Sequence, residues 1–162
     1  MNKSPLKSPD DELEMADITT YQAGVAQSAA HRLLKKFVES CLKQHDLTMM
    51  QWFVIGTIYD AGDAGIGVTR LSKAMDTNVP YITNMLNTLV AKGIVLREFR
   101  DGNNRSKFVK INPSFERTLI DIETDLRQQM RQTIYANITP AELKTYLTVL
   151  YKLSYSLEDL DS

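Results

Sequence analysis

Five neutral hydrogen-bonding side chains share one face of residues 78–93, a segment with the pattern of a helix. They are Tyr81, Thr83, Asn84, Asn87 and Thr88. The other face has the i, i+4, i+7, i+8 spacing of a buried helix surface, with Ile82, Leu86, Leu89 and Val90. Hydroxyl and amide groups can donate and accept hydrogen bonds towards the edges of nucleic-acid bases, unlike the Glu, Lys and Arg usual on a solvated face. An ordinary polar surface is the alternative interpretation.

Two strands are predicted after this helix, over residues 94–100 and 107–112, because Gly93 is a typical helix C-cap and strand-forming residues follow it. The polar turn between the strands carries Arg105, and Lys107 comes just after it. An arginine at the tip of a β-hairpin can enter the minor groove of DNA, where narrow A·T segments concentrate negative potential.

Cys41 and His45 lie four residues apart in a predicted helix, a spacing that brings a thiol and an imidazole together. Two such side chains are only half of a zinc site, and packing is the ordinary role of a cysteine in a helix. Redox sensing through Cys41 is the alternative. His31 lies among alanine and leucine residues, which favours a buried or edge histidine over a base. The sequence therefore predicts no catalytic site, no metal site and no cofactor.

Composition limits the class of protein. The chain has 162 residues, 43% of them hydrophobic, which is enough for one core or for one small domain with an extended helical region. No run of about 18 apolar residues predicts a membrane-spanning helix, and the first residues lack the apolar core of a signal peptide. A single cysteine cannot form an internal disulfide and fits a reducing compartment. We therefore expect a cytoplasmic protein that is not an enzyme.

Charge is distributed unevenly along the chain. Residues 67–111 contain eight Lys or Arg against three Asp or Glu, a net charge of +5, whereas the remainder has eleven against seventeen, a net charge of −6. Because screening limits the reach of a charge to about 8 Å at physiological salt, attraction to phosphates depends on the local surface. An overall charge of −1 is therefore compatible with DNA binding.

Three helices are predicted before the polar helix face. The first is long, over residues 20–44, and its apolar band is wider than a small domain needs. Thr48 and Gln51 form a T-x-x-Q capping box that begins the second, and residues 61–67 form a glycine-rich turn after it.

The third helix is predicted to be short, from a cap at Thr69 to Met75. We expect Leu71, Ala74 and Met75 to point inward, and Arg70, Ser72 and Lys73 to point outward. Residues 76–78 then form the turn to the polar helix, which we expect Asn78 to cap and Val79 to begin, within one residue. This spacing is typical of a helix-turn-helix.

Two more helices are predicted after the second strand. One begins at Pro113 with an apolar stripe that runs to Ile134, and the other has Thr139, Pro140 and Glu142 as its start and repeats leucines. The helix-turn-helix and the two strands are expected to form a closed domain that leaves neither stripe with a partner. We therefore expect the same region of a second chain to cover both stripes in a two-fold dimer, which the first helix joins. A monomeric helical bundle is the alternative. The predicted interface residues are Val25, Leu33, Leu126, Met130, Leu147, Leu150 and Leu157.

The order and spacing of motifs over residues 47–112 resemble the winged-helix domain of MarR-type (multiple antibiotic resistance regulator) transcription factors. Leu47, Thr48, Gln51 and Trp52 are similar to that family's L-T-x-x-Q-[FW] motif. The family's recognition helix and following strand are matched by Ile82, Thr83, Leu86, Leu89, Lys92, Gly93, Ile94, Val95 and Arg97. The family's wing motif is resembled by Asn103, Asn104, Arg105, Val109 and Ile111. Two departures are Asn103 in place of the wing aspartate, and Asn84, Asn87 and Thr88 where charged residues are common.

The resemblance implies binding of double-stranded DNA. Pro80, Tyr81, Thr83 and Asn84 would face bases in the major groove, with Asn87 and Thr88 on the same surface. Arg105 would enter the minor groove, and four cations would hold phosphates, namely Arg70, Lys73, Arg97 and Lys107. Family members commonly bind small, often aromatic anions beside the dimer helices, which implies a pocket lined by His31, Trp52 and Tyr59.

We therefore expect a mainly α-helical fold with a small β-hairpin wing. Residues 1–18 would be a disordered segment or arm, residues 19–46 and 113–162 a helical dimerisation region, and residues 47–112 the winged helix-turn-helix domain. The predicted function is that of a homodimeric transcriptional repressor on a pseudo-palindromic DNA site, released by a small aromatic or anionic ligand. The alternatives are a protein-interaction module without DNA binding and a redox-responsive regulator that uses Cys41.

Overall fold

The computed structural model describes residues 18–99 and 107–156. The chain forms two compact units, residues 1–119 and 120–162. Residues 1–17 of the predicted N-terminal arm, Arg105 and Leu157 lie outside the described residues, as does the side chain of Lys107.

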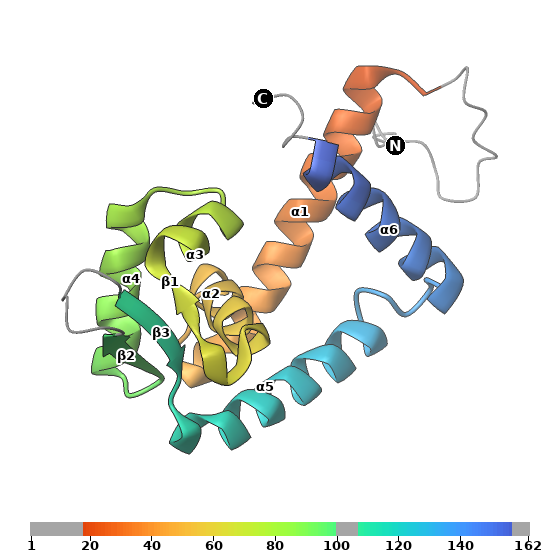
Figure 1. The fold of residues 1–162 in the computed structure, drawn as a ribbon. Coiled ribbons are helices and arrows are strands. Elements are labelled where there is room, and N and C mark those ends of the chain that lie inside the picture. The colour runs from red at the N-terminus through yellow and green to blue at the C-terminus, as the bar shows by residue number, and fades with distance from the viewer. Residues whose placement is uncertain (1–17, 100–106, 157–162) are drawn as a thin grey trace. The chain divides into compact units, whose positions relative to one another are not determined.

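The first unit contains a helix-turn-helix and a three-stranded antiparallel sheet (Figure 1). Its elements in chain order are α1 (Thr20–Leu42), the 3-10 helix η2 (Lys43–His45), α2 (Met49–Asp60), the 3-10 helix η3 (Gly62–Ala64), β1 (Ile66–Gly67), α3 (Val68–Ala74), α4 (Val79–Ala91), β2 (Val95–Phe99) and β3 (Lys107–Ile111). Helix α5 (Pro113–Gln132) begins in the first unit and continues in the second, which also contains α6 (Pro140–Ser156). The predicted fold class, mainly helical with a small β wing, is confirmed.

Side-chain caps fix where α1 and α2 begin. Thr48 Oγ1 accepts a hydrogen bond from the backbone N–H of Gln51 at 3.2 Å, and the Gln51 side chain accepts one from the backbone N–H of Thr48 at 3.0 Å. Thr19 and Gln22 form the same reciprocal pair at the start of α1. Because each box satisfies two N–H groups that a helix start leaves open, local sequence sets both starts. The predicted T-x-x-Q capping box is confirmed.

The apolar band of α1 is covered only near its C-terminal end. Val38 and Leu42 are buried there, whereas Val25 and Leu33 remain exposed. The helix thus presents apolar surface that the described residues do not cover. No helix in the described part of the chain has the length and apolar composition needed to cross a membrane.

Helix α3 begins earlier than the sequence predicts. Gly67, not Thr69, occupies the cap position, and no side chain caps this helix. The buried and exposed faces of α3 also differ from the prediction. Ser72 was expected to point outward and is 3% exposed, whereas Ala74 was expected to point inward and is exposed. The Ser72 hydroxyl donates a hydrogen bond to the Thr69 carbonyl at 2.9 Å, so it is buried without losing its partner. The early start has a tertiary cause, because the preceding residues are held as a strand.

The glycine-rich segment 61–67 is more than the turn that the sequence predicts, because it contains η3 and β1. Strand β1 pairs with β3 through Ile66 and Val109, which gives the sheet order β1-β3-β2. Gly65 allows this approach, since it has a φ of +62° and a Cβ there would lie 2.7 Å from the Val109 carbonyl oxygen. A strand of two residues is too short to show alternation, so the sequence does not indicate it.

The wing strands β2 and β3 pair in the antiparallel register that places Arg97 opposite Val109 and Val95 opposite Ile111. Both strands were predicted from the sequence and are confirmed. The side chains that are fully buried in this unit come from α1, α2, α3, α4, β2 and β3, so one core holds the helix-turn-helix against the sheet. They are Leu42, Val54, Ile55, Ile58, Leu71, Ile82, Leu86, Leu89, Val95 and Val109.

Helix α6 in the second unit begins as predicted. Thr139 and Glu142 form its capping pair, with Pro140 in the first turn, where its missing N–H costs nothing. The Glu142 carboxylate accepts hydrogen bonds from the Thr139 hydroxyl at 2.6 Å and from its backbone N–H at 2.8 Å. These bonds favour the ionised carboxylate and lower the pKa of Glu142.

Helix α5 ends before Ile134, so the predicted stripe does not reach that residue within the helix. The backbone N–H of Tyr135 instead donates to the carbonyl of Met130, five residues back, as at many helix C-termini. Desolvation in this turn, and to a lesser extent the nearby Tyr146 phenol, raise the pKa of Tyr135.

Candidate nucleic-acid interface

The start of α4 fixes the orientation of its exposed residues. The Asn78 side-chain oxygen accepts a hydrogen bond from the backbone N–H of Tyr81 at 2.9 Å, and Pro80 occupies the first turn. The predicted Asn78 cap and the start at Val79 are confirmed. The inner face is buried as expected except at Val90, which was predicted to be buried and is 37% exposed because it lies at the edge of the apolar stripe.

The outer face of α4 presents its neutral polar residues to solvent. Pro80, Tyr81, Asn84, Asn87 and Thr88 are exposed, and Thr83 is half-buried at the border with the wing. The Thr88 hydroxyl donates to the Asn84 carbonyl at 3.4 Å, which leaves its oxygen to accept. This surface offers donors and acceptors without a formal charge.

Arg97 links the wing to this surface. From β2, its Nη2 atom donates to the Asn87 side-chain oxygen at 2.7 Å and to the Thr83 carbonyl at 3.4 Å. Its Nε atom is buried and has no hydrogen-bond partner among the described residues. Arg97, which was predicted to contact a phosphate, therefore already makes hydrogen bonds inside the domain. The sequence alone gave no signal for this pairing, because the two residues lie on different elements.

The other predicted phosphate-binding cations differ in their surroundings. Arg70 and Lys73 are exposed on α3, and neither has an ion pair among the described residues. Lys110 on β3 was not predicted to contact phosphate but contributes to the local charge, and it is paired with Glu98 on β2. The +5 charge of residues 67–111 therefore includes cations that are already neutralised locally.

An exposed helix that follows a short helix after a tight turn, with a two-stranded hairpin beside it, is the arrangement of winged helix-turn-helix domains. The sequence model of the MarR family matches residues 47–107, which contain these elements up to β2 and only the first residue of β3. Residues 47–107 of the chain are thus similar to a MarR family domain. The match begins at Leu47, before the α2 cap, covers α2, α3, α4 and β2, and ends at Lys107, where β3 begins.

Solved structures of MarR family proteins share the fold of the chain. The complex of S. aureus MepR with DNA has a TM-score of 0.68 and 23% identity, covering 86% of this chain and 99% of that chain. AbsC, a MarR family transcriptional regulator from Streptomyces coelicolor, has a TM-score of 0.75 and 16% identity, over 88% and 97% of the two chains. A mutant of MarR from E. coli complexed with operator DNA has a TM-score of 0.66 and 25% identity, over 80% and 91%. MepR and MarR are thus relatives in this fold that bind DNA.

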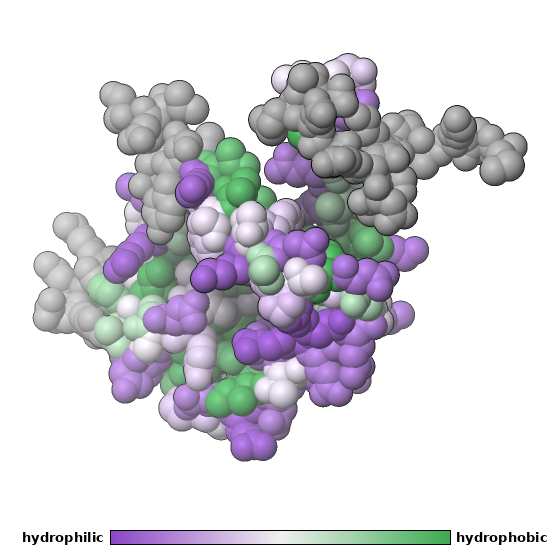
Figure 2. Space-filling model, turned by 90° about the vertical axis from the view of Figure 1, so that its right-hand side faces the viewer, coloured by the Kyte–Doolittle hydropathy of each residue, from purple (hydrophilic) through white to green (hydrophobic). Residues whose placement is uncertain are grey.

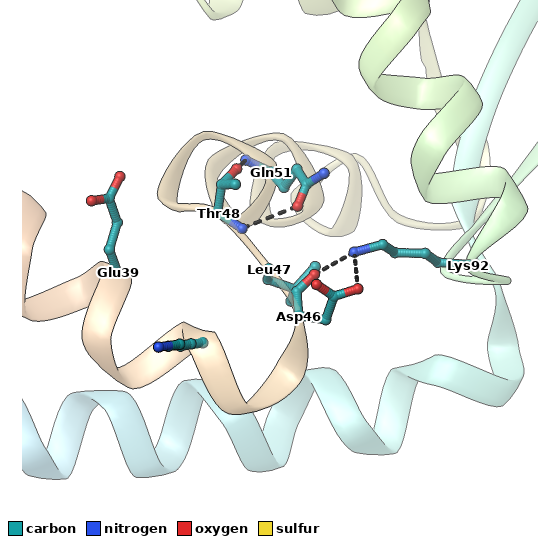
Figure 3. A pocket seen from close by; sticks show the side chains of 7 residues that line it. Glu39, Asp46, Leu47, Thr48, Gln51 and Lys92 are labelled. Atoms are coloured by element: carbon teal, nitrogen blue, oxygen red, sulfur yellow. Dashed lines mark hydrogen bonds and ion pairs between the residues drawn. The ribbon is translucent and has the colours of Figure 1, made fainter.

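A cavity of about 330 Å³ opens between the end of α1, the start of α2 and the end of α4 in the first unit (Figure 3). Lys92 from the end of α4 reaches Asp46 beside it, with 2.8 Å between Nζ and Oδ2 and a further hydrogen bond to the Asp46 carbonyl. The lining residues are Glu39, Lys43, Asp46, Leu47, Thr48, Gln51 and Lys92. None of these lining residues was predicted from the sequence to bind a ligand, and Thr48 and Gln51 were predicted only as the capping box of α2.

The three residues predicted to line a ligand pocket are not brought together at either of these two cavities. His31 is exposed on α1 rather than buried, and Trp52 belongs to the core at 9% exposure. Tyr59 lines a second, smaller cavity of about 110 Å³ together with Lys110 and Glu116. A pocket that uses all three residues stays a prediction.

The residues predicted to form a dimer interface have different exposures in the single chain. Val25, Leu33 and Leu147 are exposed, Met130 and Leu150 are half-buried, and Leu126 is buried. Figure 2 shows hydrophobic side chains at the surface between hydrophilic ones. Helix α6 adds further exposed apolar residues, namely Tyr146, Val149, Tyr151 and Leu153.

Cys41 and His45 differ in their surroundings. Cys41 is half-buried near the end of α1, and His45 is exposed in η2. Within the part of the chain that the structure describes, no group of three or more His, Cys, Asp or Glu residues could hold a metal ion. Two side chains are too few for a zinc site, and the redox role of Cys41 stays an untested alternative.

Proposed function

We propose that the protein is a transcriptional regulator that binds double-stranded DNA sequence-specifically as a homodimer. The observation that supports this proposal most directly is the exposed, uncharged outer face of α4. Tyr81, Asn84 and Asn87 lie there, on a helix whose other face packs into the core beside the wing. Such a face can read base edges in the major groove, which requires directional donors and acceptors rather than net charge. The proposed function is binding and involves no catalysis.

Exposed cations beside α4 support the electrostatic part of this function. Arg70 and Lys73 lie on α3, the helix that precedes α4 in the helix-turn-helix, where side chains commonly contact the phosphate backbone. In this proposal they hold phosphates and set the register of α4, while Arg105 at the wing enters the minor groove. Contacts to phosphates release counterions, so binding should weaken as salt rises.

Uncovered apolar surface supports the homodimer. The N-terminal half of α1 exposes Val25 and Leu33, and α6 exposes Leu147 and other large apolar residues. Apolar side chains of this size gain on the order of 1.5–3 kcal/mol each when they leave water, which favours association through these helices. A two-fold dimer would present two copies of α4 to a pseudo-palindromic site with half-sites about one helical turn apart.

Selection of bound duplexes from a random DNA pool tests the DNA-binding proposal directly. We expect enrichment of a two-fold symmetric motif, with an affinity for it that falls steeply between roughly 50 and 200 mM salt. Sedimentation at micromolar protein concentration should show a dimer. Absence of any salt-dependent binding to duplex DNA would contradict the proposal and would favour a protein-interaction module, whereas a monomer would contradict the dimer alone.

The repressor role and release by a small aromatic or anionic ligand complete the proposal and rest on the family resemblance. Calorimetric titration with a panel of phenolic acids tests the second part, since a ligand that binds more tightly to a conformation unable to bind DNA must lower DNA affinity by its differential binding. A panel that gives neither heat nor release of DNA would remove the ligand from the proposal. A reporter gene placed behind the selected motif would distinguish repression from activation.

A further inference from the structure

The contact between Arg97 and Asn87 determines which way the Asn87 side-chain amide faces. Arg97 carries only N–H donors on its guanidinium, so the Asn87 atom that lies 2.7 Å from Nη2 must be the carbonyl oxygen Oδ1. The usual ambiguity between the oxygen and nitrogen of an asparagine amide is therefore resolved by chemistry at this position. The NH2 group of Asn87 must occupy the other side of the amide.

The partner of the Asn87 oxygen is itself held in place. Arg97 extends from β2, where it pairs with Val109 in the wing, and its Nη2 atom also donates to the Thr83 carbonyl of α4. The side chain is only partly exposed, and its Nε atom is buried. A guanidinium tied to the helix in this way has little freedom to swing out to a phosphate, because doing so would leave the Asn87 oxygen and the Thr83 carbonyl without this donor.

An asparagine with a free amide commonly reads adenine, because its oxygen accepts from N6 while its NH2 donates to N7. Arg97 takes one of the two lone pairs of the Asn87 oxygen and ties that oxygen to the wing, so a bidentate contact with adenine would have to turn the amide away from Arg97. Two N–H donors remain on Asn87, which is exposed on the same face of α4 as Asn84. The base that offers two adjacent acceptors in the major groove is guanine, through O6 and N7.

We infer that Arg97 is a positioning residue that orients the Asn87 amide so that its NH2 group donates to a hydrogen-bond acceptor on DNA, with guanine as the preferred base. This inference rests on the proposed function and adds the specificity of one position in each half-site. A phosphate oxygen offers the same acceptor chemistry, and the experiment below separates the two sources.

The substitution Asn87→Asp is the sharpest test. Aspartate keeps an oxygen for Arg97 and replaces the two donors with a second acceptor, so the domain should fold while the contact with DNA is lost. Affinity for the motif selected by the wild-type protein should fall about ten- to hundredfold, and renewed selection should lose guanine at one position of each half-site. A uniform loss on all sequences, with an unchanged selected motif, would identify the acceptor as a phosphate.

The substitution Arg97→Met tests the positioning role, and Arg70→Met is its matched control. Without Arg97 the amide can rotate, so selection at the Asn87 position should broaden from guanine towards adenine. Arg70→Met removes the same charge from the surface of α3 and should weaken binding to all sequences alike. In the double variant Asn87→Ala/Arg97→Met, base preference at that position should equal that of Asn87→Ala alone, because Arg97 acts through Asn87.

Three results would overturn the inference while leaving DNA binding intact. The first is a wild-type preference for adenine at the position whose selection Asn87→Ala alters. The second is an unchanged DNA affinity in Asn87→Asp. The third is an equal loss of affinity for specific and random DNA in Arg97→Met, together with a reduced salt slope. Thermal unfolding of each variant checks the fold, and Asn87→Asp carries the test if Arg97→Met does not fold. If the wild-type protein bound no DNA, that result would instead contradict the proposed function itself.

Discussion

Lys92, at the C-terminal end of α4, forms an ion pair with Asp46, which lies between η2 and the capping box of α2 (Figure 3). Asp46 has a φ of +53°, in the left-handed region that asparagine and glycine tolerate better than most residues. The pair therefore combines a charge contact with an unusual backbone conformation. Its side chains are 27% exposed for Lys92 and 93% exposed for Asp46, so solvent screens the attraction.

Asp46→Asn should lower the free energy of unfolding by less than about 1 kcal/mol, because asparagine keeps the left-handed backbone and removes only a screened charge. Asp46→Ala should cost roughly 1–2 kcal/mol more, since alanine disfavours that backbone region. Urea unfolding at low and high salt measures both. Equal losses in the two variants would show that the backbone conformation of Asp46 has no energetic consequence.

Thr48→Ala should destabilise the protein by about 1 kcal/mol, because α2 loses the hydroxyl that accepts from the Gln51 N–H. Thr48→Ser keeps an acceptor at the same position and serves as the matched control. The measurement is the midpoint of urea unfolding followed by far-UV circular dichroism. A serine variant as unstable as the alanine variant would indicate that the threonine methyl group, not its hydroxyl, matters.

Gly65→Ala should be among the most damaging single substitutions in the first unit. The added Cβ would lie 2.7 Å from the Val109 carbonyl oxygen, at a φ of +62° that already disfavours alanine. Gly62→Ala is the control, because Gly62 has a similar φ of +61° and no atom within 4 Å of a Cβ there. We expect Gly62→Ala to cost on the order of 1–2 kcal/mol and Gly65→Ala clearly more. Similar losses in thermal unfolding would contradict the close approach of β1 and β3.

Acid should weaken the start of α6 in a way that depends on Glu142. Hydrogen bonds from Thr139 lower the pKa of this carboxyl, so the ionised form stabilises the folded state above the ordinary pKa of 4.5, and that contribution is lost as pH falls through the lower, folded value. Circular dichroism between pH 6 and pH 3 should therefore show less acid sensitivity of helicity in Glu142→Gln than in wild type. Glutamine keeps the capping geometry without titrating, and identical acid profiles would exclude this contribution.

Lys73→Ala should weaken binding to specific and random duplexes alike and reduce the slope of log affinity against log salt by about one unit, since one phosphate contact is lost. Lys36→Ala removes the same charge from the exposed surface of α1 and should leave the slope unchanged. Fluorescence anisotropy across a salt series measures both variants. A slope change as large in Lys36→Ala as in Lys73→Ala would show that total charge, not position on α3, decides affinity.

The sequence by itself determined the features that depend on neighbours along the chain. The capping boxes at Thr48 and Thr139, the Asn78 cap of α4 and the two wing strands were all predicted, because caps and strand propensities act within a few residues. The apolar stripe of α4 likewise gave its buried and exposed faces, with Val90 as the exception at the edge.

Only the tertiary structure decided the features that depend on residues far apart in the sequence. Strand β1 exists because β3 pairs with it, and that pairing places the start of α3 at Val68 and buries Ser72. The same holds for Arg97, which the sequence offered as a phosphate contact and which the fold brings to the Asn87 amide. Local patterns cannot encode such contacts, because they depend on how strands and helices pack against each other rather than on spacing along one element.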